Sequence, residues 1–211
     1  MTKRKPVSAG DLLARLANDP EYGERVRQRD EKIRIAHERH ARAEAALVQE
    51  MRAAGADINS VWDLINTKKK HPELVPILFA HLDKEYPDRV REGIARALSV
   101  GGARTGWDKL VRAYRKNPSP TDSVYGVSQV KWALHLAIAS AADVSVLDEL
   151  IGLAADRRNG RHRSFFVDAL ATIDDPRAQA ALEELKDDPD LSEGYRRLAK
   201  KKARRRKKAS K

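Results

Sequence analysis

The segment DRVREGIARAL, at residues 88–98, contains the strongest structural signal in the chain. Its apolar residues Val90, Ile94 and Leu98 recur every fourth position, which places them on one face of a helix. Outward from this segment, a shorter apolar run that begins at Pro72 predicts another helix on its N-terminal side. The two helices together form one helical hairpin.

The same two-helix unit recurs along the chain. We expect later first helices at residues 107–116, 146–155 and 177–186, and their second helices at 129–140, 162–173 and 191–201. Alignment of the first helices on Leu74, Leu110, Leu150 and Leu182 gives spacings of 36, 40 and 32 residues. Spacings near 40 with two helices per unit are typical of α-solenoids, in which each unit covers its apolar face only by stacking on the next.

The part of the chain before the repeats has a thinner apolar pattern. Residues 1–19 predict a short helix, and residues 20–58 contain a long amphipathic helix. Arg29 and His40 occupy positions of the long helix that a coiled-coil seam fills with apolar residues. We therefore expect these helices to cap the first repeat of a monomer, with a weak dimer through the long helix as the alternative.

The net charge of +11 comes from the C-terminal end. Residues 196–211 hold 11 basic residues and no acidic one, whereas residues 1–195 hold 31 of each. After a last helix at 188–201, we expect the basic tail at 202–211 to be disordered because its like charges repel one another. Such a tail either binds nucleic acid through counterion release, without sequence preference, or serves only to keep the protein in solution. The nucleic-acid alternative rests on Lys200, Lys201, Lys202, Arg204, Arg205, Arg206, Lys207 and Lys208.

The composition excludes several classes of chemistry. The 211 residues include no cysteine, which excludes a thiol nucleophile, a disulfide framework and Cys-ligated metal. The sequence has no glycine-rich phosphate loop and no nucleophile elbow, and its six histidines lack a metal-binding spacing. No apolar stretch approaches the roughly 18 residues that a membrane span needs. We expect a non-enzymatic cytoplasmic protein that binds no cofactor, no metal and no membrane.

The turn DALATIDDP at residues 168–176, followed by spaced leucines, resembles HEAT-like repeats of the bilin-lyase type. Residues 60–98 together with KWAL at 131–134 are further similar to small bacterial stand-alone HEAT-repeat proteins that have no settled biochemical role. The resemblance covers roughly residues 60–187, so we place the repeat domain at 59–187. It implies an all-α fold: a right-handed α-solenoid of about four HEAT-like helical hairpins with an N-terminal helical cap.

This architecture hosts many unrelated functions, so the resemblance alone does not settle the activity. Bilin lyases and alkylpurine DNA glycosylases also contain HEAT-like helices, which leaves a lyase-like or glycosylase-like enzyme as a third alternative. Asp168 is the only candidate carboxylate for such an enzyme. We rank this alternative below a binding role because no catalytic signature accompanies that residue.

Aligned second helices place Arg91, Lys131 and Arg163 at one equivalent position. One interpretation is a basic stripe on the concave face that grips an acidic peptide or a phosphate backbone. The other is structural: each basic residue bonds an acidic or carbonyl group of a neighbouring turn, and Asp88, three residues before Arg91, suits that role. We favour the structural interpretation for this column.

Trp132 stands at the next aligned position, which is otherwise polar. Exposed tryptophans are enriched where partners bind, so we predict a contact site for a protein partner around Trp132 and His135, one helical turn apart. The alternative is that Trp132 packs on the loop at 119–125 or on Trp107, while Trp62 is predicted to be core. The full predicted contact set is Arg91, Arg96, Lys131, Trp132, His135 and Arg163.

Overall fold

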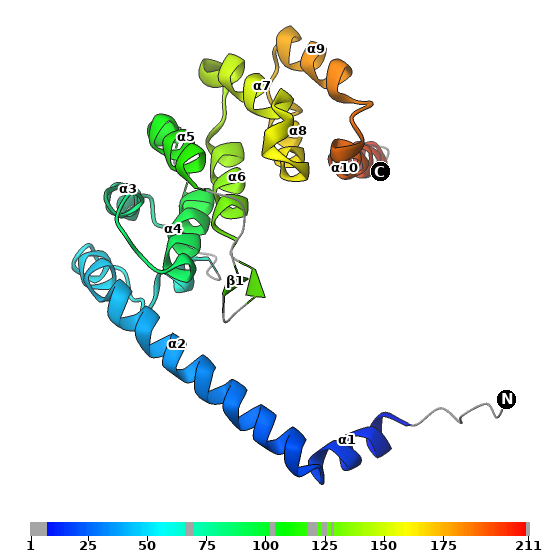
Figure 1. Ribbon diagram of the computed structural model, residues 1–211. Coiled ribbons are helices and arrows are strands. Elements are labelled where there is room, and N and C mark those ends of the chain that lie inside the picture. The colour runs from blue at the N-terminus through cyan, green and yellow to red at the C-terminus, as the bar shows by residue number, and fades with distance from the viewer. Residues whose placement is uncertain are drawn as a thin grey trace, which may run out of the picture.

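The computed structural model describes residues 8–65, 70–101, 104–117, 122–123, 126–127 and 129–209. Almost all of these residues are helical (Figure 1). Within the described ranges, the only strand pairing joins β1 (Asp122–Ser123) to β2 (Gly126–Val127) in an antiparallel ladder. The predicted all-α class is therefore confirmed. The loop at 119–125, on which Trp132 would pack in the alternative interpretation, lies largely outside the described residues.

The α-helices follow one another with short connections, close to the predicted bounds. They are α1 (Ala9–Ala17), α2 (Pro20–Ala53), α3 (Val75–His81), α4 (Asp88–Gly101), α5 (Trp107–Lys116), α6 (Val130–Ala141), α7 (Leu147–Ala155), α8 (Ser164–Leu170), α9 (Pro176–Leu185) and α10 (Ser192–Ala209). Short 3₁₀ turns connect them: η1 (Val61–Leu64), η2 (Pro72–Leu74), η3 (Arg104–Gly106), η4 (Val144–Val146), η5 (Arg157–Asn159), η6 (Arg161–Arg163) and η7 (Pro189–Leu191). None of the described helices combines the length and apolar character that crossing a membrane requires.

After α2, the helices form two rows along an arc (Figure 1). The inner row consists of α4, α6, α8 and α10, and each of these helices packs on the next. The outer row consists of α3, α5, α7 and α9, and each helix contacts an inner one. Apolar side chains between the rows form one continuous core, from Leu47 in α2 through Leu98 and Leu134 to Leu191 in η7. The described helices of the two rows therefore share one core.

Polar residues begin the helices where the sequence places them. Ser8 accepts a hydrogen bond from the backbone nitrogen of Asp11 at 3.1 Å. Asp175, directly before Pro176, accepts from the backbone nitrogen of Arg177 at 2.8 Å. These bonds satisfy backbone donors that have no partner within the helix. Ser8 and Asp175 are therefore the N-caps of α1 and α9.

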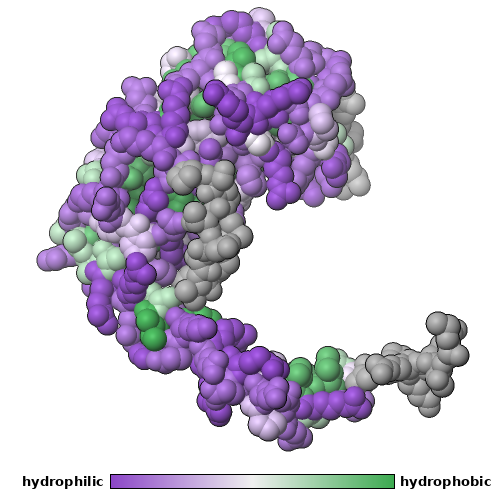
Figure 2. Space-filling model, in the orientation of Figure 1, coloured by the Kyte–Doolittle hydropathy of each residue, from purple (hydrophilic) through white to green (hydrophobic). Residues whose placement is uncertain are grey.

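The N-terminal helices cover one end of the two helical rows, which we name the body, only in part. The second half of α2 packs on the body through Leu47, Val48 and Met51, whereas α1 has no buried residue. Residues 9–35, which we name the N-terminal arm, extend away from the body (Figures 1 and 2). On the arm the apolar side chains of Leu12 and Leu13 are 52% and 67% exposed.

In the described residues α10 continues to Ala209, beyond the predicted helix end at residue 201. Its first turns are anchored on the body: the Tyr195 hydroxyl donates to the carbonyl oxygen of Leu182 at 2.6 Å. An anchored turn removes the cost of helix nucleation, and alanine, lysine and arginine are all strong helix formers. Helix propensity therefore outweighs the repulsion between like charges along this segment.

Candidate functional site

A series of arginine–aromatic contacts follows the inner row from η1 to α10. We name it the arginine–aromatic ladder, and its members are Trp62, Arg89, Arg96, Trp132, Phe165 and Arg197. The members lie in η1, α4, α6, α8 and α10. Each contact joins two elements that are neighbours in this order.

The first half of the ladder stacks guanidinium groups on indole rings. The Arg89 guanidinium carbon lies 3.3 Å from the Trp62 ring centroid. Arg96 lies between the two indoles, 5.5 Å from the Trp62 centroid and 4.2 Å from that of Trp132. The Trp62 Nε1 donates to the carbonyl oxygen of Arg89 at 3.1 Å, which holds the ring in place. Such cation–π stacks are stabilising and keep flexible arginines in one orientation.

The buried Glu92 side chain contacts both arginines and fixes their orientation. The Arg96 Nε donates to Glu92 Oε1 at 2.8 Å, and the Arg89 Nη1 lies 3.7 Å from Glu92 Oε2. The Glu92 side chain is only 8% exposed, whereas those of Arg96 and Arg89 are 25% and 37% exposed. The acid therefore faces the interior and the guanidinium groups face solvent. The accessible charge of this part of the ladder is positive.

The second half of the ladder links α6, α8 and α10. Trp132 meets Phe165 edge to face, with ring centroids 5.8 Å apart, and the Arg197 guanidinium carbon lies 5.3 Å from the Phe165 centroid. The Arg197 Nη2 lies 2.7 Å from Asp168 Oδ2. Edge-to-face contact is the favoured geometry for two aromatic rings. The carboxylate that we nominated for an enzyme is thus occupied by an ion pair between α8 and α10.

Two predicted contact residues are buried and leave the contact set. His135 is 1% exposed; its Nδ1 lies 2.8 Å from the carbonyl oxygen of Lys131 and its Nε2 lies 3.0 Å from the Tyr114 hydroxyl. Burial lowers the pKa of His135 to about 4, so the ring is neutral near pH 7. Arg163 is 0% exposed and is fully occupied by carbonyl oxygens and Asp188. Neither side chain is available to a partner.

The other column residues also have contacts within the chain. The Arg91 Nη1 lies 3.2 Å from Asp88 Oδ1, as the structural interpretation predicts, and its Nη2 donates to Asn117 Oδ1. The Lys131 Nζ lies 4.9 Å from the Tyr114 ring centroid. The column therefore ties neighbouring turns together. Of the predicted contact set, Arg96 and Trp132 are partly exposed and contact each other.

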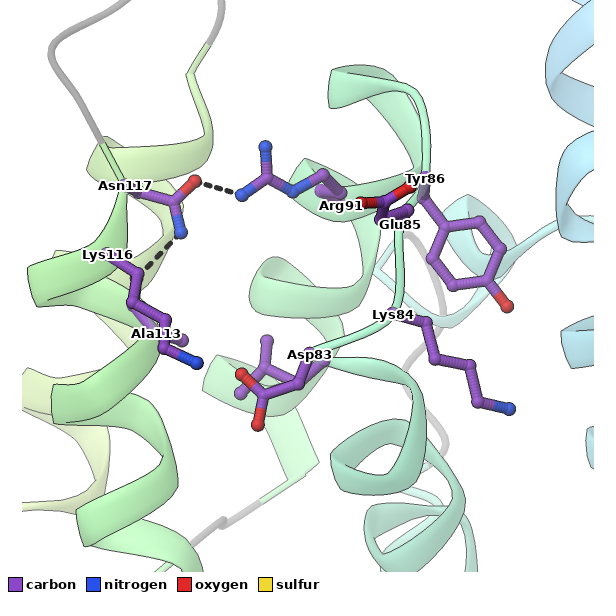
Figure 3. A pocket seen from close by; sticks show the side chains of 9 residues that line it. Asp83, Lys84, Glu85, Tyr86, Arg91, Ala113, Lys116 and Asn117 are labelled. Carbon is purple, nitrogen blue, oxygen red and sulfur yellow. Dashed lines mark hydrogen bonds between the residues drawn. The ribbon is translucent and has the colours of Figure 1, made fainter.

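A groove of about 410 Å³ lies between the loop at 83–86 and the end of α5 (Figure 3). The Arg91–Asn117 hydrogen bond spans it, and Lys116 projects from its α5 side. Both signs of charge line the groove without converging on one point. Among the described residues, every buried polar side-chain atom already has a hydrogen-bond partner. No described residue of the groove therefore has a buried unpaired polar atom that would identify a ligand.

Sequence reasoning missed four members of the ladder: Trp62, Arg89, Phe165 and Arg197. A signal was present for Arg89, because it lies seven residues before Arg96 and thus on the same face of α4. The described residues contain no group of three His, Cys, Asp or Glu side chains placed to hold a metal ion. No family model, no curated protein and no solved structure matches this chain.

Proposed function

We propose that this protein is a non-enzymatic binding module of the HEAT-like type. In this proposal the helical pairs stack as a right-handed solenoid, and the inner row receives an extended segment of a protein partner. The repeat spacing of the sequence and the packing of each inner helix on the next support it. Such a stack offers one strip of surface, on which each repeat contributes its own contact to a partner.

The arginine–aromatic ladder is the observation that carries the proposal. Its guanidinium groups are held by aromatic rings and by carboxylates of the same chain, so they lose little conformational entropy when a partner binds. A planar guanidinium matches a carboxylate with two parallel hydrogen bonds, which a lysine cannot do. Because Glu92 is buried while Arg89 and Arg96 are partly exposed, the strip favours an acidic segment.

The test is selection of peptides from a random display library on the wild-type protein. We expect the selected peptides to be enriched in Asp and Glu, and to change the fluorescence of Trp132 as they bind. Trp132→Leu keeps an apolar group at the core edge, and Arg96→Lys keeps the charge beside Glu92. Each should weaken binding of the selected peptides by about tenfold, as is usual when a residue at the centre of an interface is replaced.

Arg112→Lys is the matched control, because Arg112 is exposed on α5 of the outer row. It should leave the affinity unchanged. Thermal denaturation of every variant shows that the fold is retained. Peptides that bind wild type, Trp132→Leu and Arg96→Lys equally well would place the binding surface elsewhere and refute the proposal.

A further inference from the structure

The C-terminal part of α10, from Arg196 to Lys208, is strongly basic, and we name it the outer part of this helix. Arg196, Lys200 and Arg204 follow one another at four-residue intervals, which aligns them on one face of the helix. All three are exposed, and so are Lys201 and Lys202. Residues 205–208 are also basic, and α10 includes them.

The carboxylates of the body do not neutralise this face. Within the described chain, the ion pairs of α10 are those that Arg197 makes with Asp168 and Glu193. Arg197 belongs to the anchored part of the helix, beside Tyr195 and Leu198 in the core. Arg196 lies in the anchored part, and the other exposed basic residues follow it. Lys202 is close enough to Glu183 of α9 to help lower the pKa of that carboxyl group. Like charges at four-residue spacing repel each other, so a helix of this kind is stabilised by an external polyanion.

The linear charge density of the helix resembles that of a nucleic-acid duplex. Ten basic residues lie between Arg196 and Lys208, over about 18 Å of helix at a 1.5 Å rise per residue. The helix therefore carries roughly one positive charge per 2 Å, and duplex DNA carries one negative charge per about 1.7 Å. A single strand has about half the charge density of the duplex.

The composition of this segment argues against a membrane surface. From residue 199 to residue 209 the only apolar residues are the alanines at 199, 203 and 209. Helices that lie in a lipid interface insert large apolar or aromatic side chains, and this segment has none. It also has no aromatic ring on which an unpaired base could stack. We propose that the outer part of α10 binds the phosphate backbone of a nucleic-acid duplex, without reading its sequence.

The experiment measures fluorescence anisotropy of a labelled DNA duplex of about 20 base pairs between about 0.05 M and 0.2 M salt. The test variant combines Arg196→Gln, Lys200→Gln and Arg204→Gln. The control combines Lys32→Gln, Arg39→Gln and Arg112→Gln, which are exposed basic residues outside α10. Both variants lose the same net charge, so the comparison separates the position of the charges from their number.

We expect wild type and the control to bind the duplex with a steep salt dependence, and to bind it more tightly than either single strand. In the α10 variant, the slope of log K against log salt should fall by about 0.9 for each phosphate that the helix no longer neutralises. A chain that ends at Lys201 should lose most of the affinity while keeping the anchored turns of α10. Trp132→Leu should bind the duplex as wild type does, which separates this proposal from that for the inner row.

Three results would overturn the proposal. Equal losses in the α10 variant and the control would show that only the net charge matters. If polyglutamate binds as tightly as the duplex, the ligand of the helix is an acidic protein segment. Binding of anionic lipid vesicles in preference to the duplex would assign it to a membrane surface.

Discussion

At the residue scale, Arg163 shows how one buried side chain can join three turns. Its Nη1 donates to the carbonyl oxygen of Ala154 at 2.9 Å, its Nε to that of Gly160 at 3.0 Å, and its Nη2 to Asp188 Oδ2 at 3.0 Å. The guanidinium therefore fixes η6 against α7 and η7. This is also why Arg163 has no free surface in the fold, although it aligns in the sequence with the partly exposed Arg91 and Lys131.

Replacing Arg163 should destabilise the protein strongly. In Arg163→Ala the Asp188 carboxylate, 7% exposed, would lose its buried partner. We expect the free energy of unfolding to fall by about 3–5 kcal/mol, as for other broken buried ion pairs. Arg163→Lys should recover only part of this loss, because one ammonium group cannot reach all three acceptors. Urea denaturation measures both values, and an alanine variant as stable as wild type would contradict this account.

His135 should make the stability of the fold depend on pH. Burial lowers its pKa in the folded protein from 6.5 to about 4, and the nearby His162 and Lys131 charges act in the same direction. Between these two pH values the unfolded chain binds a proton that the folded protein does not bind. The stabilising contribution is therefore complete above pH 6.5 and is lost as the pH falls towards 4, by up to about 3 kcal/mol.

The measurement is the free energy of unfolding of wild type and His135→Gln across this pH range. His135→Gln removes the titrating group and should flatten the decrease between pH 6.5 and 4. His37→Gln, at an exposed position of α2, should keep the wild-type profile. An unchanged profile in His135→Gln would show that other groups govern the acid sensitivity.

At the element scale, a glycine controls how closely η3 approaches α3. A Cβ atom on Gly106 would lie 2.0 Å from Cζ of Phe79, so η3 can pack against α3 only without a side chain at this position. At Gly152 in α7, a Cβ atom would meet no atom within 4 Å. The two positions form a natural pair for a substitution experiment.

Gly106→Ala should lower the free energy of unfolding by about 1–3 kcal/mol, because overpacking forces the Phe79 ring to move. Gly152→Ala should instead raise it by up to about 1 kcal/mol, because alanine favours the helix. Chemical denaturation of both variants gives the two signs. Destabilisation of similar size at both positions would contradict the steric explanation.

The element scale also shows what local sequence can predict. The caps and turns at Ser8 and Asp175 follow from short-range hydrogen bonds, so the sequence places the starts of these helices correctly. α10 extends beyond the predicted helix end at residue 201, because its anchored first turn acts against the repulsion between its basic residues. That turn depends on Tyr195 meeting Leu182, an interaction between two helices that no local pattern reveals.

At the scale of the whole molecule, the N-terminal arm and the body should differ in their importance for stability. The first buried side chain of α2 is Ala36, and α1 buries none. A chain that starts at residue 31 should therefore melt within about 2 °C of wild type, since little apolar surface changes its exposure. A chain that starts at residue 56 would lack Leu47 and Met51 in the core, and should melt much lower. Differential scanning calorimetry compares the three chains.

Periodicity and caps are local properties, so the amino-acid order alone was enough to predict the helical class and most helix bounds. Which polar side chains face solvent depended on the packing of distant segments. The helical pattern of the sequence predicts that His135 and Arg163 face a partner, yet both are buried. Arg89 meets Trp62, Phe165 meets Trp132 and Arg197 meets Phe165 through contacts between elements that are distant in the sequence. The rotation of each helix against its neighbours sets those contacts, and side-chain packing across the whole stack determines that rotation.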